Sequence, residues 1–247
     1  MELKGKAALV SGGGTGLGRE ISLLLAKEGV NVAVNYSRSK DDAEKTAADL
    51  RNLGVKAVTI QADVSVPAKA EYMVAETEKA FGRLDILVNN AGTTKVVPYP
   101  DLDGLNEEDW LGIMKTNAFS IFFASRAAAK IMKKNGGGHI LSTVSAAGLR
   151  PVGSSIAYAV SKAAGIHMTK CLAVALAPEI CVNAVAPGVI LTRWVAGFSE
   201  DRLKKMQELP IMKKATDVKD CAAMYIALLK NNNITGQTIC VDAGQVI

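Results

Sequence analysis

The chain has 247 residues, of which 49% are hydrophobic, 21% charged and 5% aromatic, as in an ordinary soluble globular protein. The formal net charge is +5, but the basic residues are scattered, with short pairs at Lys133-Lys134, Lys204-Lys205 and Lys213-Lys214. Because nucleic-acid-binding proteins usually gather positive charge and aromatic rings on one surface, we expect no nucleic-acid partner. We interpret the pairs as solvated surface, with guidance of an acidic or phosphate-bearing partner as the alternative.

The cysteines and the first residues bear on the compartment. Cys171, Cys181, Cys221 and Cys240 form neither a CxxC pair nor a metal-like spacing with the two histidines. We therefore expect small buried side chains in a reducing compartment, and no metal site. No uncharged apolar run reaches 18 residues, so we expect no membrane span. The first predicted strand begins almost at once, which leaves no room for a targeting peptide and predicts a cytoplasmic protein.

Short apolar runs alternate with helix-period segments from the start of the chain. In the first half we expect strands over 7–10, 32–34, 57–60 and 84–88, and helices over about 17–27, 41–53 and 71–81. The strands lack polar alternation, as in parallel sheets that are covered on both faces.

The same rhythm continues in the second half. Strands are expected over 139–144, 181–185 and 237–241, and helices over about 107–133, 155–177 and 218–229. There is no internal repeat, low-complexity tract or linker. Repeated βα units require right-handed crossovers, so the sequence predicts one α/β domain over residues 1–247 with a doubly wound parallel sheet and helices on both faces.

A glycine-rich turn separates the first strand from the first helix. Gly12, Gly16 and Gly18 have the spacing GxxxGxG, whereas the GxGxxG fingerprint fits in no register. Glycines allow close backbone approach, and a helix N-terminus offers free N–H groups to a pyrophosphate. We interpret the turn as a dinucleotide-binding loop; an ordinary βα turn is the alternative.

The end of the second strand indicates which dinucleotide is bound. A carboxylate there would bind a ribose 2′-hydroxyl, whereas Arg or Lys accommodates a 2′-phosphate. Tyr36 occupies the position of the carboxylate, and Ser37 and Arg38 follow it. We therefore predict a preference for NADP(H), with NAD(H) as the second cofactor, unless Arg38 is merely a surface residue.

Tyr158 and Lys162 are four residues apart within a predicted helix, so both side chains lie on one face. A phenol normally loses its proton near pH ~10, and a neighbouring ammonium lowers that pKa, which would make Tyr158 a usable acid and base. Ser145 follows the 139–144 strand, whose carboxyl end faces the ligand crevice of such a sheet. Asn117 stands inside the 107–133 helix, where Asn is unfavoured. The alternatives are that Tyr158 and Lys162 form an ordinary surface pair, that Ser145 only forms a turn, and that Asn117 faces solvent.

Together these features resemble the short-chain dehydrogenase/reductase family from about Gly5 to Gly244. The motifs that carry the likeness are Ser11-Gly12-xxx-Gly16-x-Gly18 (TGxxxGxG), Asn89-Asn90-Ala91-Gly92 (NNAG), Tyr158-xxx-Lys162 (YxxxK) and Asn183-x-Val185-x-Pro187-Gly188 (NxVxPG). The likeness implies a Rossmann-like seven-stranded sheet and an enzyme that moves a hydride between nicotinamide and a carbonyl or secondary alcohol.

The resemblance also implies roles for single residues. Tyr158 would protonate the developing alkoxide, Ser145 would hydrogen-bond the carbonyl, Lys162 would hold the nicotinamide ribose, and Asn117 would anchor a water of the proton relay. Asp63 would contact the adenine. The cofactor-binding residues that it implies are Ser11, Gly12, Gly16, Leu17, Gly18, Tyr36, Ser37, Arg38, Asp63, Val64, Asn90, Ala91, Gly92, Tyr158, Lys162, Pro187, Gly188, Val189, Ile190 and Thr192, of which Thr192 would hold the carboxamide.

Substrate choice is expected in a lid over residues 190–215, which is rich in apolar residues. Such content favours an acyl chain, steroid or aromatic ketone over a small polar sugar; the alternative is that half of these residues simply pack the lid onto the body. The chain most resembles the 3-oxoacyl-thioester reductase branch, and the lysine pairs would suit an acidic acyl carrier. Sugar, steroid or quinone reductases of the same family, and a non-catalytic nucleotide sensor, are the rivals. The resemblance further implies a homotetramer.

Overall fold

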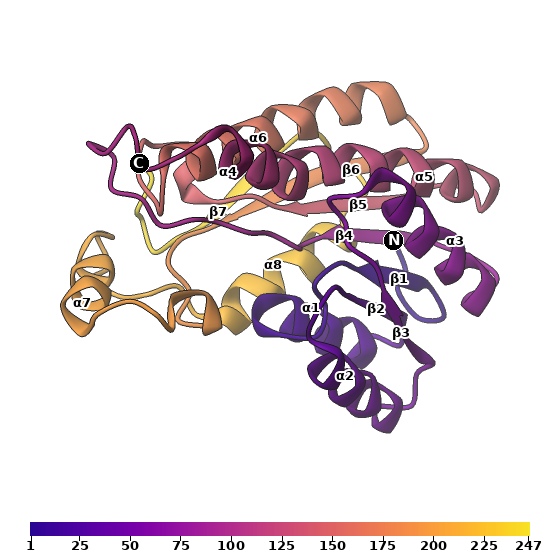
Figure 1. The fold of residues 1–247 in the computed structure, drawn as a ribbon. Coiled ribbons are helices and arrows are strands. Elements are labelled where there is room, and N and C mark those ends of the chain that lie inside the picture. The colour runs from indigo at the N-terminus through magenta and orange to yellow at the C-terminus, as the bar shows by residue number, and fades with distance from the viewer.

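A computed structural model describes residues 1–247, except for the side chain of Arg202. Figure 1 shows its central sheet with helices on either side. The strands are β1 (Ala7–Val10), β2 (Asn31–Tyr36), β3 (Ala57–Gln61), β4 (Ile86–Asn89), β5 (Gly138–Thr143), β6 (Ile180–Pro187) and β7 (Thr238–Val241). All neighbours pair in parallel, in the order β3-β2-β1-β4-β5-β6-β7. The predicted doubly wound sheet is confirmed.

Helices follow the strands in alternation. They are α1 (Gly16–Lys27), α2 (Lys40–Asn52), α3 (Pro67–Phe81), α4 (Glu107–Met114), α5 (Ser120–Lys134), α6 (Ile156–Leu176), α7 (Glu200–Glu208) and α8 (Val218–Leu229). The predicted helix over 71–81 begins earlier, at Pro67, because proline is well tolerated in a first turn.

Successive residues of the inner strands enter two separate hydrophobic cores. Ala8 and Val10 of β1 pack in one core with α1, α2 and α8, while Leu9 packs in the other with α3, α5 and α6. Such strands must be apolar at every position, which is the pattern that the sequence shows.

The predicted long helix over 107–133 is interrupted. A capping box formed by Asn106 and Asp109 starts α4, and a π-helical segment, Lys115–Phe119, joins α4 to α5. A π turn holds an extra residue, and such turns are frequent at functional sites. It is this segment that carries Asn117.

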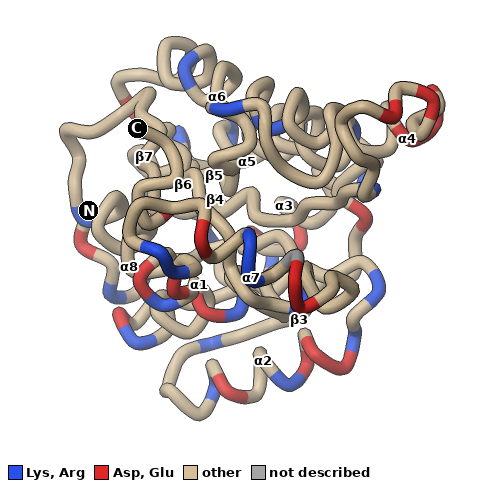
Figure 2. Tube along the Cα trace, turned by 90° about the vertical axis from the view of Figure 1, so that its left-hand side faces the viewer, with Lys and Arg blue, Asp and Glu red and all other residues tan. Residues whose placement is uncertain are grey.

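Surface features agree only in part with expectation. Figure 2 shows Lys and Arg interspersed with Asp and Glu along the trace, without a basic stripe over the elements it displays.

Cys221 is buried as predicted, but the prediction is wrong for Cys171 and Cys240, which are exposed at a helix surface and on the edge strand β7. Among the helices of the described chain, none is long and apolar enough to span a membrane.

Candidate active site

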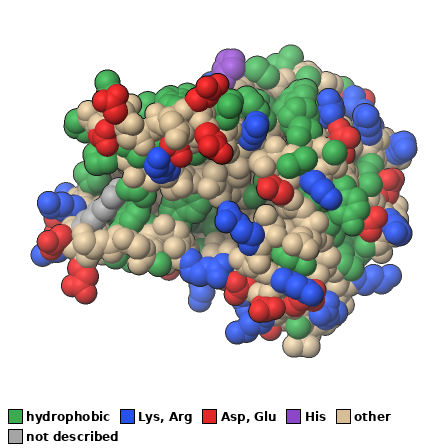
Figure 3. All heavy atoms as spheres, in the orientation of Figure 1, with side chains coloured by type: hydrophobic (Ala, Val, Ile, Leu, Met, Phe, Trp, Pro, Cys, Tyr) green, Lys and Arg blue, Asp and Glu red, His purple; other side chains and the backbone are tan. Residues whose placement is uncertain are grey.

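A cleft of about 1070 Å³ opens at the carboxyl ends of the strands. Segments that follow β1, β2, β3, β4 and β5, and the end of β6, contribute to its wall, and the region around α7 closes one side. Figure 3 shows the surface hollowed beside this region. The order of the strands reverses between β1 and β4. Doubly wound proteins bind ligands at the carboxyl ends of the strands beside such a reversal of strand order.

The glycine-rich turn has the shape of a phosphate cradle. Gly12 and Gly16 have φ of +61° and +52°, and a Cβ on Gly18 would lie 2.2 Å from the Gly12 carbonyl oxygen. Thr15, the N-cap of α1, makes no side-chain capping bond, so the first N–H groups of the helix face the cleft without that partner. The loop therefore fits a pyrophosphate, with glycine required by both conformation and space.

Ser11 supports this loop from behind. Its hydroxyl accepts hydrogen bonds from the backbone N–H groups of Asn90 (2.9 Å) and Ala91 (3.0 Å), while the Asn90 amide donates to the carbonyl oxygens of Ser11 and Gly12. Ser11 is 3% exposed and does not line the cleft, unlike the other predicted loop residues Gly12, Gly16, Leu17 and Gly18. Its position indicates that it shapes the loop from behind, and direct contact of Ser11 with the cofactor stays a prediction.

The far end of the cleft combines a ring, hydroxyls and one exposed cation. Tyr36, Ser37 and Arg38 line it after β2, and Asp63 and Val64 line it after β3. Arg38 and Ser37 are exposed to the cleft. A guanidinium and a hydroxyl are suited to a phosphate group, and this end is therefore chemically compatible with a 2′-phosphate.

Tyr158, Lys162 and Ser145 meet at the floor of the cleft. The Ser155 hydroxyl caps α6 by accepting from the N–H of Tyr158 (3.3 Å), which fixes the helix start. One turn later, the Lys162 Nζ lies 5.7 Å from the centre of the Tyr158 ring and donates to the Thr143 carbonyl oxygen (2.9 Å). The predicted shared face is thus present.

Burial sets the protonation of this pair. It raises the pKa of Tyr158, and a hydrogen bond with Ser145 opposes that rise. Burial also lowers the pKa of Lys162 to about 8. The expected depression of the Tyr158 pKa by Lys162 is therefore not seen, because burial disfavours the charged forms of both groups.

Asn117 is buried, so the solvent-facing alternative is wrong. Its side chain is 2% exposed; its Nδ2 donates to the Thr93 carbonyl (2.9 Å) and to the Ser161 hydroxyl (3.0 Å), and its Oδ1 accepts from the Thr93 N–H (2.8 Å). It does not line the cleft. The amide instead ties the segment after β4 to α6, directly behind Tyr158.

The nicotinamide end predicted from the sequence also lies in the cleft. Its lining includes Asn90, Ala91, Gly92, Pro187, Gly188, Val189, Ile190 and Thr192. The Thr192 hydroxyl accepts from the Trp194 N–H (3.4 Å), and the Trp194 ring lies 6.0 Å from that of Tyr158 between centroids. An aromatic wall therefore stands beside the candidate acid.

The predicted lid contributes some of its apolar residues to the cleft and not others. Trp194, Val195, Phe198, Met206 and Leu209 line it, whereas Ile211 and Met212 are exposed elsewhere. Sequence reasoning missed Thr143, Arg193 and Gln245, which also line the cleft. Thr143 could have been found from its place at the end of β5; the other two carry no motif.

Comparisons with known proteins agree with this geometry. The model of the short chain dehydrogenase family matches residues 6–203. The chain is 37% identical over 239 residues to the granaticin polyketide synthase putative ketoacyl reductase 2 of Streptomyces violaceoruber, covering 96% of this chain and 94% of the relative. It is also 37% identical over 243 residues to a 3-oxoacyl-[acyl-carrier-protein] reductase FabG of Staphylococcus epidermidis, covering 97% and 98%.

Solved structures are similar throughout their length. A short chain dehydrogenase from Burkholderia cenocepacia, in complex with NADP, superimposes with a TM-score of 0.91 at 34% identity, covering 99% of both chains. The NADPH-dependent 3-quinuclidinone reductase from Rhodotorula rubra superimposes with a TM-score of 0.89 at 30% identity, covering 99% of this chain and 92% of that one.

Proposed function

The chain belongs to the short-chain dehydrogenase family, and we propose that it is an NADP(H)-dependent oxidoreductase that transfers a hydride between the nicotinamide and a ketone or secondary alcohol. The observation that carries this proposal is the meeting of Tyr158, Lys162 and Ser145 beside a glycine cradle in one cleft. A non-catalytic nucleotide sensor would need only the glycine-rich turn, so the three polar side chains beside it favour an enzyme.

Each of these side chains has a role in carbonyl reduction. The nicotinamide, when bound, supplies the hydride. Ser145 donates a hydrogen bond to the carbonyl oxygen, and the Tyr158 hydroxyl gives its proton to the same oxygen as negative charge develops there. Lys162 holds the nicotinamide ribose, and its ammonium stabilises the phenolate that remains. Solvent then returns the proton to Tyr158.

Asn117 acts mainly by position. Both N–H groups of its amide are engaged with Thr93 and Ser161, and Ser161 donates to the Tyr158 carbonyl oxygen (2.7 Å). We propose that it fixes α6 relative to the segment after β4. The anchoring of a water by Asn117 stays a prediction.

We propose NADP(H) as the preferred cofactor because Tyr36 occupies the position where a carboxylate would select NAD(H), and Ser37 and Arg38, which suit a 2′-phosphate, follow it along the wall of the cleft. The expected result is a higher kcat/KM with NADPH than with NADH, and a reversal of that order in Arg38→Asp. A clear preference of the unaltered enzyme for NADH would contradict the assignment.

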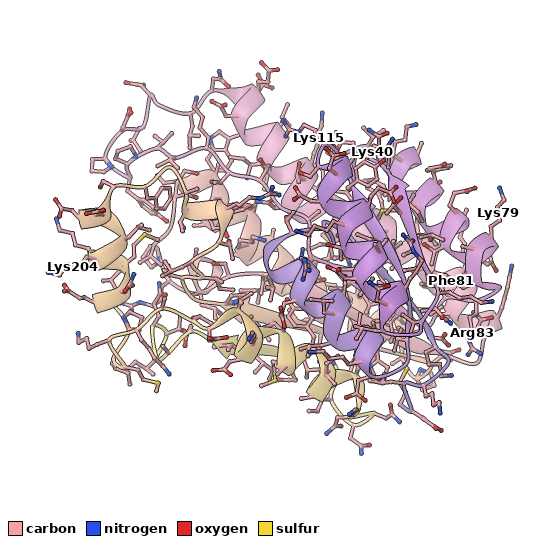
Figure 4. All side chains as sticks on the ribbon, turned by 90° about the horizontal axis from the view of Figure 1, so that it is seen from below. Lys40, Lys79, Phe81, Arg83, Lys115 and Lys204 are labelled. Atoms are coloured by element: carbon pink, nitrogen blue, oxygen red, sulfur yellow. The ribbon has the colours of Figure 1, made fainter. Side chains whose placement is uncertain are left out.

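A 3-oxoacyl thioester is the substrate that we propose, with sugar, steroid and quinone or aromatic ketones as rivals. The apolar wall of Trp194, Phe198 and Met206 supports it, as does the similarity to the two ketoacyl and 3-oxoacyl reductases. Lys204 and Lys205 are exposed on α7, which borders the cleft, and would suit an acidic carrier. Figure 4 shows Lys204 at the opposite end of the molecule from Lys79, Phe81 and Arg83.

A carbonyl screen read by NADPH absorbance tests the proposal. It should contain 3-oxoacyl thioesters, steroids, sugars and quinones. Turnover of the thioesters is expected, and turnover of nothing in the panel would contradict an enzymatic function. Turnover of another class alone would remove the acyl substrate and keep the family chemistry.

We also propose a cytoplasmic homotetramer in which α4, α5 and α6 lie at subunit interfaces. Exposed apolar side chains on these helices support it, among them Leu111, Phe122 and Val174. Sedimentation equilibrium should give four times the mass of one chain, and a monomer would contradict this arrangement.

A further inference from the structure

The six residues after β7 form a fixed turn against the lid. The Asp242 carboxylate accepts hydrogen bonds from the N–H groups of Gly244 (3.0 Å) and Val246 (2.8 Å). The Gly244 carbonyl accepts from the N–H of Ile211 (3.4 Å), in the segment after α7. These three hydrogen bonds hold Gln245, which lies between Gly244 and Val246, in one place.

Gln245 lines the cleft, and its side-chain oxygen is a hydrogen-bond acceptor without a partner among the described residues. The residue is 8% exposed, and its backbone oxygen accepts from the Arg150 guanidinium. Its Oε1 is buried and has no hydrogen-bond partner within the described chain. A buried polar atom without a partner costs free energy, and native proteins rarely keep one without a reason. Rotation of the Gln245 amide would turn Oε1 toward the cleft, where a ligand that donates to it would remove this cost.

The position of Gln245 points to the substrate as that ligand. Arg150, which holds Gln245, leads into Val152 and Gly153, which also line the cleft. A Cβ on Gly153 would lie 3.3 Å from the Tyr158 ring, so this wall adjoins the candidate acid. The phosphate loop follows β1, four strands away from β7, which at about 4.8 Å per strand is roughly 19 Å. The pyrophosphate is therefore not within reach.

We propose that Gln245 Oε1 accepts a hydrogen bond from an N–H or O–H group of the substrate, and that the enzyme selects carbonyl compounds that carry such a donor beyond the reacting carbonyl. This rests on the proposed function and narrows its substrate class. For a 3-oxoacyl thioester, the donor is an amide N–H in the thiol arm.

Two thioesters that differ in this donor test the proposal. The 3-oxobutanoyl thioester of N-acetylcysteamine carries the amide, whereas the S-pentyl thioester has a chain of similar length without it. We expect the unaltered enzyme to favour the amide by about tenfold in kcat/KM, which corresponds to about 1.4 kcal/mol. Gln245→Met, which keeps the length and removes the acceptor, should lose this preference, so that the ratio of the two kcat/KM values falls to about one.

Leu209→Met is the matched control, because Leu209 lines the same cleft without a polar group. Leu209→Met should change kcat/KM for the two thioesters by the same factor. An unchanged thermal unfolding midpoint for Gln245→Met shows that this variant is folded. The same preference in Gln245→Met as in the unaltered enzyme would overturn the role of Gln245 and leave the proposed function standing. Turnover of neither thioester by the unaltered enzyme would overturn the acyl substrate together with this inference.

Discussion

Replacement of Lys162 by methionine should stabilise the folded chain at pH 7 although it removes a residue of the proposed chemistry. Lys162 is 4% exposed, and burial lowers its pKa from 10.5 to about 8. One pKa unit corresponds to about 1.4 kcal/mol, so the buried ammonium costs about 3.5 kcal/mol at neutral pH. Methionine also loses the bond to the Thr143 carbonyl, worth about 1.5 kcal/mol. The expected net gain in the free energy of unfolding is about 2 kcal/mol.

The dependence on pH has a definite sign. Below the folded pKa of about 8, both states of the unaltered chain carry the proton, and the cost is fully present. Between about pH 8 and 10.5 the folded chain has released the proton while the unfolded chain still holds it, so the stability of the unaltered chain rises with pH. The advantage of Lys162→Met should therefore disappear by pH 10.

Urea unfolding followed by circular dichroism measures both effects, at one protein concentration and at pH 7 and pH 10. Lys170→Met serves as the control, because Lys170 is an exposed lysine of the same helix, and its effect should not vary with pH. If Lys162→Met is less stable than the unaltered chain at pH 7, the buried Lys162 ammonium does not destabilise the fold. The same holds if the difference in unfolding free energy between the two chains is equal at both pH values.

Three further substitutions separate binding from stability. Gly18→Ala puts a Cβ 2.2 Å from a backbone oxygen, so NADPH should bind roughly tenfold or more weakly by fluorescence titration, whereas Gly112→Ala, with open space around it, should bind normally; equal affinities would exclude a tight cradle. Tyr225→Phe removes a buried hydroxyl 2.7 Å from that of Thr143 and should cost about 1–2 kcal/mol of unfolding free energy, and no loss would mean that this bond is not used. Asp85→Ala removes the partner of Arg83 and of the Ala7 backbone N–H at the edge opposite the cleft, and should cost about 2–3 kcal/mol in urea unfolding with kcat unchanged; a lower kcat would show coupling to the cleft.

Local patterns in the sequence are sufficient to predict the sheet and the candidate catalytic pair. Strands buried on both faces need apolar residues at every position, and Tyr158 and Lys162 share a helix face because of their spacing alone. Ser145 follows from its place at the end of β5. Periodicity does not reveal the π turn at Asn117, since apolar spacing continues across it.

Local sequence patterns do not predict contacts between segments that are far apart in the chain. The burial of Asn117 depends on Thr93, and that of Gln245 depends on Arg150 and on the segment after α7, all far away in the chain. The exposure of Cys171 is likewise decided by which face of α6 meets the sheet. These positions required the structure.

Turnover by Tyr158→Phe tests the acid–base role most directly, because the substitution removes only the hydroxyl. With NADPH and the best ketone of the screen, kcat should fall by roughly 10² to 10⁴ while the dissociation constant of NADPH stays the same. A variant that binds NADPH normally and retains most of the turnover would contradict the central claim that the phenol of Tyr158 delivers the proton.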